Sequence, residues 1–129
     1  IKMAKYSDKI LKRKGIKYDF CYIHFKETDI PGHDNKPYEK KNFIEIIDKR
    51  FFSFLKRYAE KYNVKVIVTG DHSTPCKLHD HSADPVPVLL FGKGIKSDKT
   101  DKFSEVQAKK GDFGTVIGKN LLKKAGFIR

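Results

Sequence analysis

Carboxylate and imidazole side chains gather in two short polar stretches of this sequence. The first stretch, TDIPGHD, places Asp29 and His33 four residues apart in a segment that contains Pro31 and Gly32. Proline and glycine are typical of a tight turn. One loop therefore carries an oxygen and an imidazole nitrogen that together could chelate a first-row divalent metal ion. The same stretch, taken alone, also fits a polar turn whose aspartate bonds its own backbone.

The second stretch, GDHSTPCKLHDH, contains Asp71 and His72 next to each other and His81 at its end. Neighbouring side chains of an extended segment point to opposite sides. Asp71 and His72 can therefore bind one ion only if the chain bends there, and otherwise they serve different ions. His79 could replace His81 as a ligand, but we favour His81 because it lies closer to the apolar run that follows.

The elements between the two stretches predict that they meet. Residues 64–69 form an apolar, β-branched run that is typical of a strand buried on both faces of a parallel sheet. Residues 18–26 are dense in aromatic side chains and predict a second strand. Apolar positions at helical spacing predict the longest helix over residues 38–62, with Asn63 as a cap. Strand, helix and strand form a unit with parallel strands, so both polar loops should emerge at one edge of the sheet.

The remaining segments complete an α/β fold, which we expect to be a mainly parallel sheet flanked by helices. Residues 86–91 predict a third strand, and residues 1–14 a short amphipathic helix. Residues 93–111 are polar and predict a loop. A final helix is expected from Asp112, as its N-cap, to Gly126.

Composition narrows the class of protein. The chain has 129 residues, which suits one domain. Its net charge of +12 invites a nucleic-acid partner, but the lysines are scattered and no zinc-finger, RNA-recognition or KH signature is present. A basic field would equally suit a phosphorylated small substrate. Two cysteines make no disulfide scaffold. No membrane-length apolar run or signal peptide is visible, so we expect a cytoplasmic protein, and an initial Ile suggests a piece of a longer chain.

Three motifs carry a resemblance to a known family. In this order, TDIPGHD, VTGDHSTP and DHSADPVP resemble the C-terminal half of the cofactor-independent (2,3-bisphosphoglycerate-independent) phosphoglycerate mutases of archaeal type. These enzymes belong to the alkaline-phosphatase superfamily, and the match covers nearly all of residues 18–125. The resemblance implies an alkaline-phosphatase-like core and an isomerase of glycolysis and gluconeogenesis. That enzyme interconverts 3-phosphoglycerate and 2-phosphoglycerate through a phosphoserine.

The resemblance also implies two divalent metal ions, manganese or zinc and alternatively magnesium. Asp29, His33 and His81 would hold one ion, and Asp71 and His72 would hold the other. Such a pair suits phosphoryl transfer, because two cations polarise the phosphate and lower the pKa of the nucleophile. Five protein ligands do not fill two coordination shells, so water, substrate or residues outside this chain must supply the rest.

One departure from the family decides how the chain is interpreted. The family's nucleophilic serine and a further metal-binding aspartate lie near the N-terminus, on a strand that this chain lacks. Ser73 and Thr74 stand near the expected ions, but a hydroxyl beside Asp-His is more often a turn or capping group. We therefore interpret residues 1–129 as the C-terminal metal-binding part of the catalytic domain, with no catalytic nucleophile of its own. Its partners would be phosphoglycerate and the missing N-terminal half.

Two alternatives stay open. The chain could belong to another phosphatase or to a phosphopentomutase of the same superfamily, which would use the same ions. It could also be a catalytically silent basic domain that binds a metal ion or a polyanion through its positive field.

Overall fold

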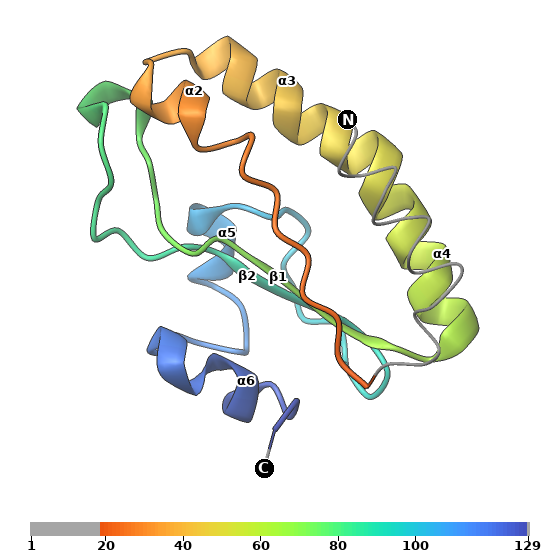
Figure 1. The fold of residues 1–129 in the computed structure, drawn as a ribbon. Helices are drawn as coiled ribbons and strands as arrows, with labels where there is room; N and C mark the ends of the chain where they lie inside the picture. The colour runs from red at the N-terminus through yellow and green to blue at the C-terminus, as the bar shows by residue number, and fades with distance from the viewer. Residues whose placement is uncertain (1–18, 129) are drawn as a thin grey trace.

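A long helical rod lies across one side of a small sheet in this α/β protein (Figure 1). The computed structural model describes residues 19–128. The rod consists of α3 (Pro37–Ile47), a π-helical segment η2 (Asp48–Phe52) and α4 (Ser53–Tyr62). It ends at Asn63, whose φ of 54° lies in the left-handed region that asparagine tolerates. The predicted helix over residues 38–62 and its Asn63 cap are confirmed.

The sheet has two antiparallel strands in the part of the chain that the structure describes. They are β1 (Lys65–Thr69) and β2 (Val88–Gly92), paired so that Lys65 faces Gly92 and Thr69 faces Val88. The strands predicted over residues 64–69 and 86–91 both exist, but the mainly parallel sheet that we expected is not found among the described residues. An apolar run predicts a strand but does not specify the direction of the partner strand. The expected burial on both faces is also wrong, because residues 65–68 are only partly buried. Here β1 returns to β2 through a loop rather than a helical crossover, which favours antiparallel pairing.

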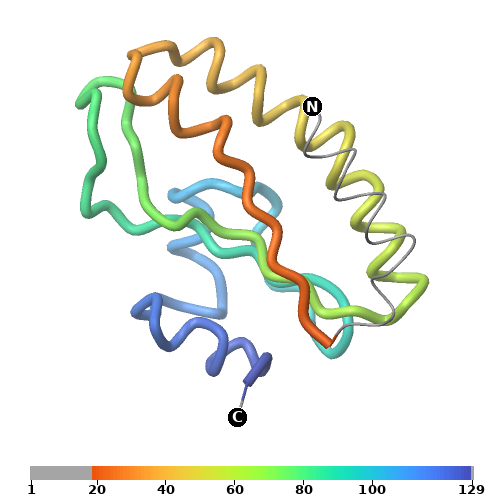
Figure 2. Tube along the Cα trace, in the orientation of Figure 1, coloured from red at the N-terminus to blue at the C-terminus, as the bar shows by residue number. Residues whose placement is uncertain are grey.

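The segment 19–26 follows an extended path to the first loop but joins no ladder (Figure 2). Its predicted assignment as a strand parallel to residues 64–69 is therefore wrong. Ile23 and Phe25 pack instead against the helical rod, where the Phe25 ring lies 5.0 Å from that of Phe51. The aromatic density that suggested a strand serves this side-chain packing rather than backbone pairing.

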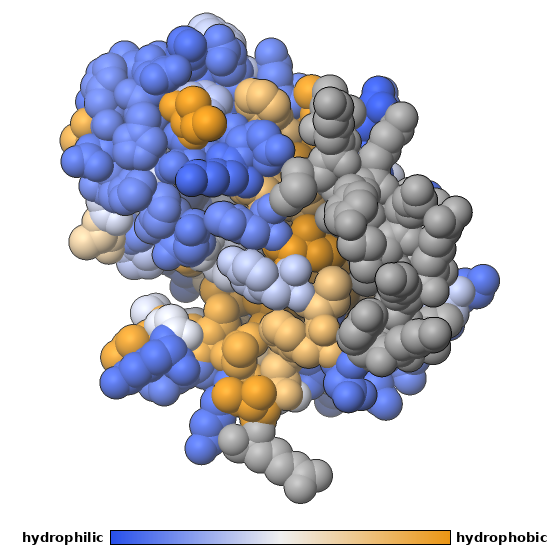
Figure 3. Space-filling view, viewed as in Figure 1, coloured by the Kyte–Doolittle hydropathy of each residue, from blue (hydrophilic) through white to orange (hydrophobic). Residues whose placement is uncertain are grey.

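The hydrophobic core is small. Phe51 and Tyr58, on the inner face of the rod, form its centre. Few other apolar side chains are buried among the described residues, and many are exposed, including Phe20 and Tyr22 on the extended segment. Apolar residues gather at the middle and lower part of the face in Figure 3, whereas the upper left is mostly hydrophilic. A core of this size leaves much of the positioning of loops to polar contacts.

Two short helices pack against each other at one end of the molecule: α2 (Ile30–His33) and η3 (Cys76–Leu78). The segment just before η3 also comes close to α2, because a Cβ atom on Gly32 would lie 2.7 Å from the carbonyl oxygen of Thr74. The Cys76 thiol adds a weak contact to the carbonyl oxygen of Pro31 at 3.8 Å. The two polar stretches of the sequence are thereby brought together.

The C-terminal third is less regular than predicted. Within the expected loop 93–111 lies α5 (Glu105–Ala108), capped by the Ser104 side chain. The expected helix from Asp112 is wrong in its start: η4 (Gly118–Asn120) and α6 (Leu121–Lys124) supply only its end. The left-handed φ of 65° at Gly114 interrupts the region between.

The predicted helix over residues 1–14 lies outside the described residues. None of the helices that the structure describes combines the length and the apolar character needed to cross a membrane.

Candidate metal centre

The first loop supplies two converging side chains. Asp29 immediately precedes α2 and His33 is its last residue, so one helical turn places them on the same face. Pro31 lies in the first turn, where its missing N–H costs no hydrogen bond. The His33 Nε2 atom lies 3.5 Å from Asp29 Oδ1. This is the pair that the sequence spacing predicted.

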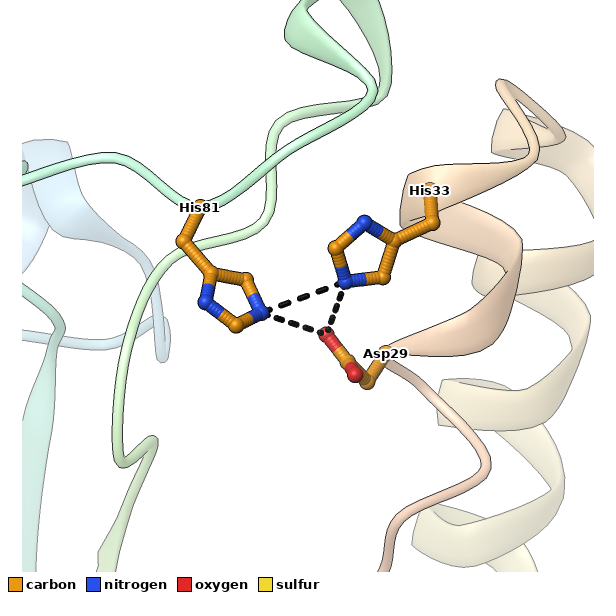
Figure 4. A group of neighbouring side chains, drawn as sticks. All are labelled: Asp29, His33 and His81. Atoms are coloured by element: carbon orange, nitrogen blue, oxygen red, sulfur yellow. Dashed lines mark hydrogen bonds and ion pairs between the residues drawn. The ribbon is translucent and has the colours of Figure 1, made fainter.

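The second loop adds a third side chain to this pair (Figure 4). His81 Nε2 lies 3.2 Å from His33 Nε2 and 3.7 Å from Asp29 Oδ1. Ligand atoms on a tetrahedral zinc ion about 2.1 Å away lie about 3.4 Å from one another, which is close to all three separations. The nearest point equidistant from the three atoms lies in their plane, about 2.0 Å from each, as the separations of 3.2, 3.5 and 3.7 Å require. The separations of the three atoms are therefore close to those of three ligands on one divalent ion.

His79 fixes the orientation of His33 rather than joining the cluster. The His33 Nδ1–H donates to the carbonyl oxygen of His79 at 3.0 Å, and the His79 Nδ1–H donates to the carbonyl oxygen of His33 at 3.1 Å. A carbonyl only accepts, so the Nε2 atom of neutral His33 carries the lone pair that faces the cluster. Such an outer hydrogen bond typically orients a metal-binding imidazole. His81, which we favoured from the sequence, occupies the position beside Asp29.

Thr74 stabilises the carboxylate of the cluster. The Thr74 hydroxyl donates to Asp29 Oδ1 at 2.7 Å, and Thr74 is only 4% exposed. This hydrogen bond is the largest influence that lowers the pKa of Asp29. Partial burial opposes the shift, and the neighbouring imidazoles of His33, His72 and His81 reinforce it. Asp29 is thus held as a carboxylate, which is the form that binds a cation.

Asp71 and His72 form a second pair beside the first cluster. Asp71 Oδ2 lies 3.6 Å from His72 Nε2, and Asp71 Oδ1 accepts the His72 backbone N–H at 3.1 Å. The chain bends between them, so both side chains face the same side. The His72 ring lies 3.8 Å from the His81 ring, at an interplanar angle of 34°. All five sequence-predicted residues therefore lie at one end of the molecule, in two adjoining groups.

A backbone bridge in the second loop holds the two groups together. Ser82 N–H donates to the carbonyl oxygen of Ser73 at 2.9 Å, which folds the stretch back on itself. Lys40 of α3 donates to the carbonyl oxygen of Thr74 at 2.7 Å and ties the loop to the rod. The positions of His72 and His81 thus depend on loop hydrogen bonds more than on the sheet.

Sequence reasoning missed His24, whose Nε2 atom lies 3.8 Å from Asp71 Oδ2. Its neighbours Ile23 and Phe25 both pack on the core, so alternation along an extended chain places His24 on the opposite side. This alternation of apolar and polar side chains could have predicted from the sequence that His24 faces away from the core. No such pattern predicts the contact of Thr74 with Asp29, because the two residues are far apart in the sequence and only the fold joins them.

Comparison with known proteins fits this geometry. The family model described as the Metalloenzyme superfamily matches residues 2–124. The chain belongs to this superfamily. The name of the superfamily implies that its members bind metal ions, and Asp29, His33 and His81 form a candidate site for one in this chain.

Several proteins that are similar to this chain carry the name phosphoglycerate mutase. The 2,3-bisphosphoglycerate-independent phosphoglycerate mutase of Pyrococcus furiosus is 44% identical over 105 residues, which are 81% of this chain and 25% of that protein. The enzyme of the same name from Thermococcus gammatolerans is 40% identical over 119 residues, covering 92% of this chain and 28% of that protein. The resemblance inferred from the three motifs is confirmed.

A solved structure shares the fold. The PH0037 protein from Pyrococcus horikoshii superposes with a TM-score of 0.83 and 38% sequence identity, over 98% of this chain and 38% of that one. The chain spans about a quarter of the length of the curated relatives above.

Proposed function

We propose that residues 1–129 are the C-terminal metal-binding part of a cofactor-independent phosphoglycerate mutase. The reaction would interconvert 3-phosphoglycerate and 2-phosphoglycerate through a phosphoserine carried on the N-terminal part of the enzyme, outside this chain. Alone, the chain would be inactive. The proposal includes a cytoplasmic enzyme of glycolysis and gluconeogenesis, with manganese or zinc as the ions and magnesium as the alternative.

The convergence of Asp29 Oδ1, His33 Nε2 and His81 Nε2 carries this proposal, because their separations match the ligand spacing of a divalent ion. The identity of 40–44% to enzymes named phosphoglycerate mutase supports the choice of reaction. The chain offers one carboxylate and two imidazoles to a first ion, and Asp71 with His72 to a second. Bound there, the two ions would supply charge to polarise a phosphate and lower the pKa of a nucleophile.

The chain's own residues would prepare this end of the molecule for a phosphorylated substrate. Asp29, His33 and His81 are partly exposed, so a substrate could reach them from solvent. The Thr74 hydroxyl donates to Asp29, and His33 donates to the carbonyl oxygen of His79. These two hydrogen bonds hold the ligand atoms in place before any ion binds. Preorganisation of this kind reduces the rearrangement needed at the moment of reaction.

The test is mutase activity of the full-length protein that contains this chain, with 3-phosphoglycerate as substrate and manganese present. His81→Ala and Asp71→Ala should each lower kcat by at least about 100-fold, because each removes a ligand whose loss exceeds that of an outer-sphere partner. Asp48→Ala, on the exposed side of the rod, should leave kcat unchanged. Undiminished turnover in both ligand variants would contradict the proposal.

The same protein separates the alternatives. Release of inorganic phosphate without formation of 2-phosphoglycerate would indicate a phosphatase, and turnover of ribose 5-phosphate would indicate a phosphopentomutase. A silent basic domain would show no metal-dependent turnover and would bind polyanions with a steep salt dependence. Each of these results would replace the mutase assignment.

A further inference from the structure

Thr74 stands between the two groups of proposed metal ligands. Its hydroxyl lies 2.7 Å from Asp29 Oδ1 in the first group and 3.2 Å from His72 Nδ1 in the second. The residue is 4% exposed, so water does not compete for these contacts. A buried hydroxyl with polar partners on both sides is strongly constrained, because leaving either partner unsatisfied is costly.

Counting donors fixes the direction of both hydrogen bonds. A hydroxyl has one hydrogen, and the Asp29 carboxylate can only accept, so that hydrogen goes to Asp29. The hydroxyl oxygen must then accept from His72, which requires a hydrogen on Nδ1. In neutral His72 the lone pair is consequently on Nε2, the atom that lies near Asp71.

We propose that Thr74 is a positioning residue that couples the two ion sites through this one hydroxyl. The inference rests on the proposed two-ion function and adds a link between the ions. Ion binding by Asp29 fixes the carboxylate that receives the hydroxyl hydrogen. The hydroxyl lone pair is then held toward His72, which keeps the His72 tautomer whose Nε2 can bind the second ion. Through this hydrogen bond, occupancy of the first site favours binding at the second, and the converse holds by linkage, which offsets part of the repulsion between two neighbouring cations.

Thr74 is itself held rigidly enough to transmit this effect. Lys40 donates to its backbone carbonyl at 2.7 Å. On its other side the Thr74 methyl group packs close to Gly32, where an added Cβ would approach it to 2.9 Å. Two functions of the side chain can therefore be separated: the hydroxyl bonds the ligands, and the methyl group packs against α2.

Two variants divide these functions. Thr74→Val keeps the branched shape and removes the hydroxyl, whereas Thr74→Ser keeps the hydroxyl and removes the methyl group. We would titrate Zn²⁺ alone into the full-length protein by calorimetry and record ¹⁵N imidazole spectra of the ion-free protein. Wild type should bind two ions, with a second-ion affinity higher than that of Thr74→Val, and its His72 spectrum should show hydrogen on Nδ1. Thr74→Val should lose the coupling, typically about 5–150-fold in affinity, and the tautomer preference; Thr74→Ser should retain both.

The possible results separate the role of Thr74 from the proposed two-ion function on which it rests. Fewer than two bound Zn²⁺ ions in wild type would contradict the proposed two-ion function. Two ions in wild type, with unchanged coupling and tautomer in Thr74→Val, would overturn the role of Thr74 alone. Equal losses in Thr74→Val and Thr74→Ser, with the tautomer unaffected in both, would also overturn it, because that pattern reports packing rather than the hydroxyl.

Discussion

Asp29 and Asp98 are two loop carboxylates with the same local chemistry and different surroundings. Each accepts a hydrogen bond from a threonine hydroxyl, and in each that bond is the largest influence lowering the carboxyl pKa. Among the described residues, the other hydrogen bonds to the Asp98 carboxylate come from backbone N–H groups, including those of Thr100 at 2.8 Å and Asp112 at 3.1 Å. Asp29 instead faces imidazoles. A hydrogen bond from a threonine hydroxyl to a carboxylate therefore stabilises both loops. Only Asp29 also has histidine side chains around it, and these make it a candidate ion site.

The same substitution at both positions should break this comparison most clearly. Asp29→Asn removes a charged ligand from the cluster and should weaken binding of the first Zn²⁺ ion by more than about 100-fold, exceeding the usual loss for an outer-sphere partner. Asp98→Asn should leave Zn²⁺ affinity unchanged, because no imidazole is among the groups that shift the pKa of Asp98. Calorimetric titration of both variants checks this. Similar affinities in the two variants would mean that the histidines around Asp29 do not form a site.

A glycine pair sharpens the role of packing between the loops. A Cβ on Gly32 would lie 2.7 Å from the Thr74 carbonyl oxygen, whereas one on Gly118 would meet nothing within 4 Å. Gly32→Ala should push the Thr74 loop away from Asp29 and lower Zn²⁺ affinity by roughly 10-fold, as expected for loss of an outer-sphere partner. Gly118→Ala should bind Zn²⁺ as wild type does. If Gly32→Ala binds equally well, the closeness of α2 to the loop does not matter for the site.

The smallest effect is the pH dependence of stability at Asp98. Its pKa is lower in the folded protein than its ordinary value, so its contribution to stability is present above about pH 4 and is lost as pH falls through the lowered folded pKa. The stability difference between wild type and Asp98→Asn should therefore shrink as pH decreases from about 6 to about 3, which spans the acid range of carboxyl groups. Urea unfolding with EDTA present measures it. A difference that grows toward the acid end would reverse the sign assigned to Asp98.

The sequence predicted local pairs better than remote ones. Asp29 and His33 were recognisable because one helical turn brings residues four apart together. The Asn63 cap and the long helix followed from turn chemistry and periodicity in the same way. His81 was preferred to His79 from its place in the chain, and the fold puts it beside Asp29.

The remote features needed the fold. The apolar run of β1 predicted a strand but could not specify that its partner β2 runs antiparallel. The aromatic residues of 19–26 looked like a strand, yet they pack on the rod instead. The hydrogen bond between Thr74 and Asp29 joins two loops that are far apart in the sequence, and no local sequence pattern predicts it.

The most direct test is anomalous diffraction from crystals of the protein grown or soaked with Zn²⁺. The account predicts a peak about 2.0–2.2 Å from Asp29 Oδ1, His33 Nε2 and His81 Nε2 at once, as zinc–ligand distances require. Saturating Zn²⁺ with no peak at that point, or with its strongest peak on other side chains, would contradict the central claim.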